Sequence, residues 1–325
     1  MTLPMPAAFA RTHSERLVAA IRAEIDAGGG WISFARYMDR ALYAPGLGYY
    51  SAGAAKLGET GDFVTAPEIS PLFARTLAQQ VRQILALAGG AVLELGAGSG
   101  RLACDLLLAL EALHALPERY AILEVSADLQ ARQRERIARG APHLLPRVAW
   151  LSELPARWCG LVFGNEVLDA LPVHLVVNEG GNWRERGVTW QDGFRWQDAP
   201  IASAELDAAT AALPNESGYL TEINLAGPKL IATLANALQA GTLLLMDYGF
   251  GGREYYHPQR SAGTLMCHYR HHAHDDPFFL PGLQDITAHV DFTAIAAAGI
   301  DRGLALQGYT TQARFLVNCG VTGLM

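Results

Sequence analysis

The 325-residue chain has a globular composition, with 50% hydrophobic and 18% charged residues, and can bury one large core or two modest ones. Its formal net charge of -7 argues against a general nucleic-acid or membrane-surface binder, because both need a basic surface, although a basic protein or peptide is not excluded. The four cysteines are far apart and form no CxxC pair, which argues against a disulfide framework and a thiolate zinc site.

Three helices are predicted in the first 90 residues. Apolar residues recur at helical spacing from about Thr12 to Ala27, Ser33 can cap a second helix, and Ser70-Pro71 opens a third that runs to about Leu87. This region has too little apolar pattern for a core of its own. We therefore expect residues 1–90 to form a helical cap with a covering loop, packed on the remainder of the chain.

Strands that alternate with helices begin at residue 91. Strands are predicted at 91–95 and 120–125, each followed by a helical stretch, at 102–113 and 129–139. Further short strands are expected at 147–151, 161–163, 242–246 and 304–307. Such an alternation predicts a doubly wound parallel sheet over residues 91–325, covered on both faces.

An antiparallel hairpin interrupts this pattern at about residues 175–197. Alternating residues flank Gln191-Asp192-Gly193, which is typical of a tight hairpin turn. We expect the hairpin to be an insertion after the fourth strand, and Trp183, Trp190 and Trp196 to pack it on the body or to form a docking surface.

A glycine turn, Glu94-Leu-Gly-Ala-Gly-Ser-Gly100, follows the first of the parallel strands. Ligands of open α/β sheets bind beyond the carboxyl ends of the strands, and glycines there allow a tight turn and close approach of a ligand. Glu124 ends the next strand, where its carboxylate can accept hydrogen bonds from both hydroxyls of a ribose. The pattern predicts a nucleoside-containing cofactor.

The glycines fit a dinucleotide site less well than a methyl-donor site. A GxGxxG/A match that starts at Gly96 fails at Arg101, and the match from Gly98 through Ala103 lies two residues late relative to the strand. With Glu94 inside the strand end, the turn resembles the first motif of class I methyltransferases, which use S-adenosyl-L-methionine. A dinucleotide oxidoreductase and an inactive Rossmann-like scaffold are the alternatives.

Five segments in the same order resemble the MidA-like family, which includes the mitochondrial complex I assembly methyltransferase and its bacterial relatives. These segments span residues 43–50, 61–70, 93–100, 165–174 and 257–264. The resemblance implies a class I methyltransferase (Rossmann-like) fold with S-adenosyl-L-methionine as the methyl donor. For the mitochondrial members it also implies methylation of an arginine in a protein substrate.

The resemblance implies a set of cofactor-binding residues in four places. Residues 61–70 should fold over the cofactor, although Glu68 could serve only the dipole of the helix that follows it. The expected residues are Gly61, Asp62, Thr65, Glu68, Glu94, Gly96, Ala97, Gly98, Gly100, Glu124 and Asn165.

Two carboxylates after the fourth strand are the candidate catalytic residues. A guanidinium acceptor needs carboxylates that hold the planar cation and help remove its proton, and Glu166 is the first candidate and Asp169 the second. Either could instead cap a helix or pair with a local arginine. A methyltransferase for another residue or a small molecule, and a non-catalytic assembly chaperone, are the other functions considered.

The histidine-rich run His268 to Asp276 suggests a metal site, but it has no HExxH pattern or cysteine partner. We expect a structural polar network or a peptide-binding segment there, and no metal.

The first residues lack the regions of a signal peptide, and no apolar run reaches the roughly 18 residues of a membrane span. We therefore expect a cytoplasmic protein with no membrane partner. The acidic charge argues against a nucleic-acid partner, and the resemblance to the MidA-like family implies a protein substrate.

Overall fold

The computed structural model describes residues 3–52 and 66–324 of the chain, which fold into two compact units. Unit 1 is built from the segments Met1–Ala52, Leu168–Leu230 and Tyr248–Ala298. Unit 2 is built from the segments Gly53–Val167, Ile231–Asp247 and Gly299–Met325. Each unit is therefore assembled from three separate stretches of sequence.

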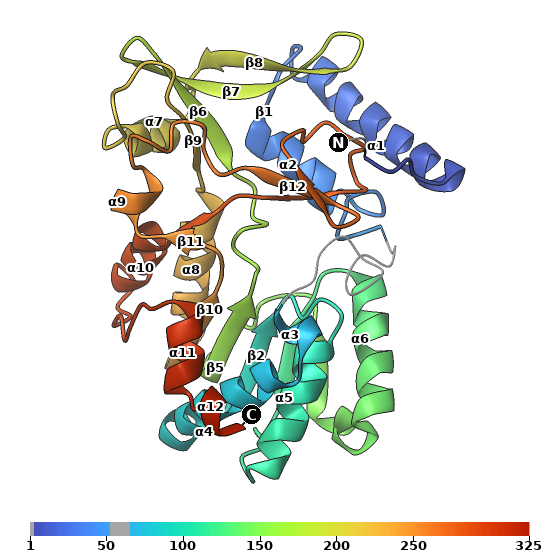
Figure 1. Cartoon of the computed structure of the whole chain (residues 1–325), viewed down its shortest axis with the longest axis vertical. Helices are drawn as coiled ribbons and strands as arrows, with labels where there is room; N and C mark the ends of the chain where they lie inside the picture. Colours follow the sequence, from blue (N-terminus) through green and yellow to red (C-terminus); the bar gives the residue numbers. More distant parts are fainter. Residues whose placement is uncertain (1–2, 53–65, 325) are drawn as a thin grey trace. The chain divides into compact units, whose positions relative to one another are not determined.

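A five-stranded parallel sheet forms the centre of unit 2 (Figure 1). Its order is β10-β5-β2-β3-β4, and every neighbouring pair is parallel. The strands are β2 (Ala91–Leu95), β3 (Tyr120–Leu123), β4 (Val148–Leu151), β5 (Trp158–Asn165) and β10 (Leu238–Met246). From β2 the chain adds strands first on one side and then on the other, so the sheet is doubly wound as predicted, and its order reverses beside β2.

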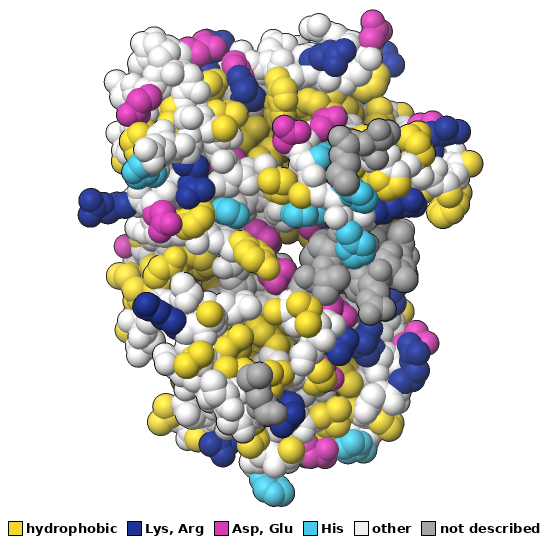
Figure 2. Space-filling view, in the orientation of Figure 1, with side chains coloured by type: hydrophobic (Ala, Val, Ile, Leu, Met, Phe, Trp, Pro, Cys, Tyr) yellow, Lys and Arg dark blue, Asp and Glu magenta, His cyan; other side chains and the backbone are white. Residues whose placement is uncertain are grey.

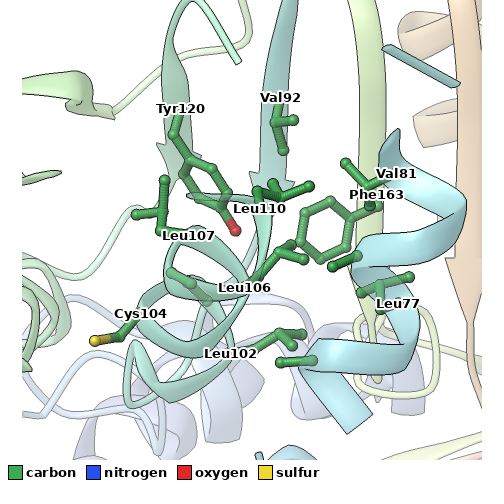
Figure 3. Packing of buried hydrophobic residues seen from close by; sticks show 14 of the residues in the cluster. Leu77, Val81, Val92, Leu102, Cys104, Leu106, Leu107, Leu110, Tyr120 and Phe163 are labelled. Atoms are coloured by element: carbon green, nitrogen blue, oxygen red, sulfur yellow. The ribbon is translucent and has the colours of Figure 1, made fainter. Parts of the chain in front are cut away.

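The helices of unit 2 pack on this sheet or on one another through apolar side chains. They are α3 (Ala66–Ile69), α4 (Leu72–Ala88), α5 (Arg101–Ala112), α6 (Ala127–Gly140), a 3-10 helix (Pro142–Arg147), α11 (Gln312–Asn318) and α12 (Val321–Leu324). Leu77 of α4 and Leu106 and Leu110 of α5 pack on Val92 and Phe163 of the sheet (Figure 3). Burial of each such side chain contributes about 1.5–3 kcal/mol, and this holds the helix after the glycine turn against the sheet.

The antiparallel sheet of unit 1 contains the predicted hairpin. It consists of β1 (Ile32–Ser33), β6 (His174–Glu179), β7 (Asn182–Trp190), β8 (Phe194–Pro200) and β9 (Leu220–Ile223). Trp190 pairs with Phe194 across the predicted turn, in which Asp192 and Gly193 have positive φ. The insertion is larger than a hairpin, because β6 pairs with both β7 and β9.

The first two helices pack on this antiparallel sheet. They are α1 (Ala8–Ala27), which begins four residues earlier than expected, and α2 (Phe34–Tyr43). Leu17, Ile21 and Ile25 lie four residues apart on one face of α1 and are buried. Ser33 caps α2 as predicted, because its Oγ accepts a hydrogen bond from the Arg36 backbone N–H at 3.2 Å.

The remaining elements of unit 1 are short. They are α7 (Ala204–Thr210), β11 (Gly249–Phe250), α9 (Gly252–Tyr255), β12 (Met266–Tyr269), β13 (His272–His274), β14 (Asp285–Thr287) and β15 (Val290–Asp291). Two helices, α8 (Ala226–Ala237) and α10 (Phe292–Ile300), begin in unit 1 and end in unit 2. The strands β12, β13 and β14 form a small antiparallel sheet of their own.

The observed units differ from the division at residue 90 that the sequence suggested. Helices α3 and α4 belong to unit 2, whereas α1 and α2 belong to unit 1. The reason is a long-range pairing, in which Ile32 of β1 lies opposite Val188 of β7. The strand predicted at 304–307 is wrong, because this segment has no regular structure and Leu306 is 60% exposed.

The surface agrees with the modest acidic charge of the chain. On the face drawn in Figure 2, Lys and Arg side chains are scattered among acidic, polar and apolar ones and do not gather in one patch. Within the described residues, no helix combines the length and hydrophobicity that a membrane span requires.

Candidate cofactor site and active site

The glycine turn leaves the carboxyl end of β2 with all three glycines in the left-handed region. Gly96, Gly98 and Gly100 have φ values of 58°, 53° and 78°, which only glycine adopts without strain. Gly100 is also the N-cap residue of α5. Space is limited as well, since a Cβ on Gly96 would lie 3.1 Å from Val167 Cγ1, and one on Gly100 would lie 2.9 Å from Gln133 Cα. Conformation therefore favours glycine at both Gly96 and Gly100, and packing requires it at Gly100.

Glu124 directly follows β3, the strand that neighbours β2 and its glycine turn. The Glu124 side chain is buried, and its Oε1 accepts a hydrogen bond from the Ser126 backbone N–H at 2.9 Å. Its Oε2 accepts one from Gln133 Nε2 at 3.1 Å. Burial raises the pKa of Glu124, and the hydrogen bonds from Ser126 and Gln133 oppose this rise. The carboxylate is held in one orientation beside the turn.

Glu94 lies beneath the turn and inside the core. It is 2% exposed, and its Oε2 accepts a hydrogen bond from the Tyr120 hydroxyl at 2.7 Å. Burial raises the pKa of Glu94 to about 8, and the nearby Glu124 carboxylate acts in the same direction. Its carboxyl group is therefore protonated at neutral pH. This position favours support of the turn from below over direct contact with a ligand.

The carboxyl end of β5 carries Asn165 and Glu166. Asn165 Nδ2 donates a hydrogen bond to Glu166 Oε1 at 3.3 Å, whereas Asn165 Oδ1 is buried and has no hydrogen-bond partner within the described part of the chain. Glu166 has a φ of 53°, which is uncommon for a residue other than glycine. Its backbone N–H donates to the Met246 carbonyl at 2.8 Å. The next N–H, that of Val167, donates to Asp247 Oδ2 at 3.0 Å. Backbone strain of this kind is concentrated at functional sites.

Glu68 of α3 contacts the glycine turn from another side. Its Oε1 accepts a short hydrogen bond from the Ser99 hydroxyl, and its carbonyl accepts one from Arg101 Nη1 at 2.9 Å. Arg101 also pairs with Asp105, at 3.5 Å. The Glu68 carboxylate thus joins α3 to the turn. Its contact with a cofactor and its alternative role at the helix dipole both stay predictions.

The remaining predicted site residues are Gly61, Asp62, Thr65, Ala97 and Asp169. Gly61, Asp62 and Thr65 lie outside the described residues. Ala97 is buried within the turn. Asp169 is buried too, but it belongs to unit 1, whereas Glu166 belongs to unit 2. Neither carboxylate caps a helix, because residues 167–173 contain none.

The residues of unit 2 fit S-adenosyl-L-methionine, which supplies a methyl group on a sulfonium. Glycines have no side chain to keep a ligand from the backbone of the turn, and the anchored Glu124 carboxylate can accept hydrogen bonds from ribose hydroxyls. The buried Asn165 Oδ1 calls for a hydrogen-bond donor, because an unpaired buried acceptor costs about 1–3 kcal/mol. These three features lie at the carboxyl ends of β2, β3 and β5, which are neighbours in the sheet.

The histidine-rich run forms part of the β12–β13 hairpin. His272 Nδ1 lies 2.7 Å from the Arg270 carbonyl, and the Asp276 backbone N–H donates to His274 Nδ1 at 3.3 Å. Among the described residues no group of three or more His, Cys, Asp or Glu side chains could hold a metal ion. These contacts fit the structural network that was one of the two expected roles.

The tryptophans of the inserted segment pack on unit 1. Trp190 lies edge-on to Phe194, and Trp183 lies edge-on to Tyr219. Trp196 contacts Phe34 and remains 39% exposed. Packing is therefore the role that their contacts support.

Sequence reasoning missed two buried polar residues, Gln133 and Glu222. Glu222, in unit 1, accepts hydrogen bonds from the backbone N–H groups of Thr264 and Leu265 at 2.8 and 2.9 Å. A Cβ on Gly263 would lie 2.3 Å from Glu222 Oε1, which explains the glycine in the 257–264 motif. The signal for Glu222 was its place in the short apolar strand β9, where a lone carboxylate needs a buried partner.

Replacement of Gly100 by Ala is expected to lower both stability and cofactor affinity. The left-handed backbone costs an alanine about 1–2 kcal/mol, and the contact with Gln133 Cα adds at least ~1 kcal/mol by overpacking. Gly303→Ala is the matched control in unit 2, because its φ is 87° but a Cβ there would meet no described atom within 4 Å. Urea denaturation and titration with S-adenosyl-homocysteine measure both effects. Equal losses for the two variants would contradict the packing argument.

Known proteins resemble the chain over most of its length. Residues 72–310 match the family model described as "Putative S-adenosyl-L-methionine-dependent methyltransferase". The mitochondrial protein arginine methyltransferase NDUFAF7 of Bos taurus is 30% identical over 90% of this chain and 70% of its own length. The Drosophila melanogaster homologue is 28% identical over 92% of this chain and 74% of its own length.

A protein of known structure is more similar in sequence to the chain than these two relatives. A protein of Burkholderia thailandensis with bound S-adenosyl-homocysteine is 53% identical and superposes with a TM-score of 0.97, covering 99% of this chain and 85% of that one. The expected class I methyltransferase fold and its S-adenosyl-L-methionine cofactor are confirmed, and the dinucleotide alternative is not supported. The chain belongs to this family of S-adenosyl-L-methionine-dependent methyltransferases, as the resemblance to the MidA-like family predicted.

Proposed function

We propose that the enzyme methylates an arginine side chain of a protein substrate. The relatives from Bos taurus and Drosophila melanogaster carry the name protein arginine methyltransferase, and the chain matches each of them over at least 90% of its length. The observation in this protein that carries the proposal is the carboxylate of Glu166, set on a left-handed backbone at the carboxyl end of β5. A carboxylate is the partner that a planar guanidinium binds best.

The cofactor-binding residues that we propose are those of the turn and the two neighbouring strand ends. Gly96, Gly98 and Gly100 give the cofactor access to the backbone, Glu124 accepts from the ribose hydroxyls, and Asn165 Oδ1 accepts from a donor of a bound ligand. S-adenosyl-L-methionine supplies the methyl group. The protein's contribution is alignment and exclusion of water, which are the main requirements of an in-line displacement.

Glu166 holds and orients the acceptor in this proposal. Its two oxygens bind the N–H groups of the guanidinium, and its carboxylate accepts the proton that the acceptor nitrogen loses as it takes the methyl group. The Asn165 amide donates to Glu166 Oε1 and limits rotation of the carboxylate. Asp169, the second candidate from the sequence, belongs to unit 1 and stays a prediction.

Labelling of a lysate tests the acceptor. The protein is incubated with isotopically labelled S-adenosyl-L-methionine and a lysate of a strain that lacks it, and the labelled product is analysed by mass spectrometry. We expect labelled methylarginine in a protein. Labelled methyllysine or a labelled metabolite without methylarginine would contradict the acceptor assignment. Cofactor binding without any labelled product would instead support a non-catalytic assembly role.

A further inference from the structure

Gln133 of α6 connects two parts of the proposed cofactor site. Its side chain is fully buried, and its Nε2 donates hydrogen bonds to the Gly98 carbonyl at 3.0 Å and to Glu124 Oε2 at 3.1 Å. Its Oε1 accepts a hydrogen bond from Trp150 Nε1 at 2.9 Å. One amide therefore contacts the glycine turn, the carboxylate after β3 and the strand β4.

The partners of Gln133 determine the orientation of its amide. An indole N–H is only a donor, and a carbonyl and a carboxylate are only acceptors, so the amide oxygen must face Trp150 and the amide nitrogen must face Gly98 and Glu124. A glutamate at this position would place an acceptor against two acceptors, and an apolar residue would leave all three partners without this contact. The arrangement is specific for an amide of this length.

We propose that Gln133 is a positioning residue that sets the affinity for S-adenosyl-L-methionine by holding Gly98 and Glu124 in one arrangement. This inference rests on the proposed role of Glu124 as the acceptor for the ribose hydroxyls. Glu124 Oε1 is held by the Ser126 backbone and Oε2 by Gln133, so the carboxylate cannot rotate away from the turn. The bond to the Gly98 carbonyl fixes the peptide at the middle of the turn. Preorganisation of this kind raises affinity because less freedom is lost on binding.

The pKa of Glu124 supports the same role for Gln133. Burial raises the pKa of Glu124, and the hydrogen bond from Gln133 lowers it again. Gln133 thereby favours the ionised form, which accepts hydrogen bonds with both oxygens. A protonated carboxyl would offer one hydroxyl donor in place of an acceptor.

A double-mutant cycle tests the proposal on the full chain. S-adenosyl-homocysteine is titrated calorimetrically into the wild type, Gln133→Met, Glu124→Gln and the double variant. We expect Gln133→Met to weaken binding at least about tenfold, because hydrogen bonds to charged groups are lost. In the Glu124→Gln background the same change should cost less than about threefold, because the two residues act together. Gln130→Met is the matched control on α6, since Gln130 donates to the Glu124 backbone carbonyl and not to its carboxylate.

Kinetics separate positioning from a purely structural role. Gln133→Met should raise KM for S-adenosyl-L-methionine and leave kcat at saturation within about twofold. Trp150→Phe is the second variant, which loosens the amide without removing it. It should weaken binding about threefold, and less in the Glu124→Gln background.

The results distinguish the inference from the function on which it rests. Wild-type affinity in Gln133→Met and Trp150→Phe, together with weakened binding in Glu124→Gln, would overturn the role of Gln133 alone. Equal losses with and without Glu124→Gln would also overturn it. Unchanged affinity in Glu124→Gln would show that the proposed role of Glu124 is itself wrong.

Discussion

Replacement of Glu166 by Gln is expected to lower kcat at least about 100-fold and to change the affinity for S-adenosyl-homocysteine less than about twofold. The amide keeps the shape of the side chain but loses the charge, and its NH₂ group opposes the N–H donors of a guanidinium. The backbone of Glu166, with its bond to the Met246 carbonyl, needs no change. Steady-state kinetics with a protein acceptor and calorimetric titration measure the two quantities.

Two further variants make the Glu166 result specific. Glu166→Asp keeps the charge and withdraws it by one methylene group, so we expect intermediate activity. Glu153→Gln alters an exposed carboxylate of unit 2 and should leave kcat unchanged. Wild-type kcat in Glu166→Gln would remove this residue from the proposed mechanism. A parallel loss of S-adenosyl-homocysteine binding would move its role from the acceptor to the cofactor.

Glu94→Gln is expected to stabilise the protein relative to the wild type as the pH rises. The pKa of Glu94 is about 8 in the folded protein and 4.5 in the unfolded reference, so the unfolded chain loses the proton first. The stability associated with Glu94 is therefore fully present below pH 4.5 and is lost progressively up to about pH 8. At pH 7 the loss amounts to roughly 3 kcal/mol.

A glutamine at position 94 cannot ionise and does not incur this loss. Its amide oxygen can still accept the hydrogen bond from the Tyr120 hydroxyl. The free energy of unfolding, measured by urea denaturation from pH 5 to pH 8, should fall with pH in the wild type by up to about 1.4 kcal/mol per pH unit more than in the variant. Glu153→Gln, at an exposed position, should follow the wild type. Parallel curves for wild type and Glu94→Gln would show that Glu94 is ionised in the folded protein.

The predicted elements of unit 2 agree closely with the structure. Short apolar runs followed by helical periodicity predicted β2, β3, α5 and α6 to within two residues, because hydrophobic spacing and local turn residues determine such elements. The run at 304–307 shows the limit of that reasoning. It has the apolar residues of a strand, but a strand also needs a neighbour, and tertiary contacts decide whether there is one.

The organisation of the chain into units could not be derived from local patterns. Each unit combines three segments, and the pairing of β1 with β7 joins residues more than 150 positions apart. Gln133 and Glu222 were missed for a related reason, since Gln133 reaches Gly98 and Glu222 reaches Thr264, which are 35 and 42 positions away. A single glutamine in a polar helix has no signal until the fold brings Gly98, Glu124 and Trp150 around it.

The sequence alone determined the nature of the cofactor site. The glycines at the end of a strand and the carboxylate at the end of the next strand are local features, and parallel strands bring their carboxyl ends to the same edge of a sheet. Only the tertiary structure decided the state of each group. Burial raises the pKa of Glu94, hydrogen bonds from Ser126 and Gln133 orient Glu124, and a left-handed backbone presents Glu166. These properties depend on desolvation, on side-chain contacts and on backbone conformation in the folded chain, which no local pattern records.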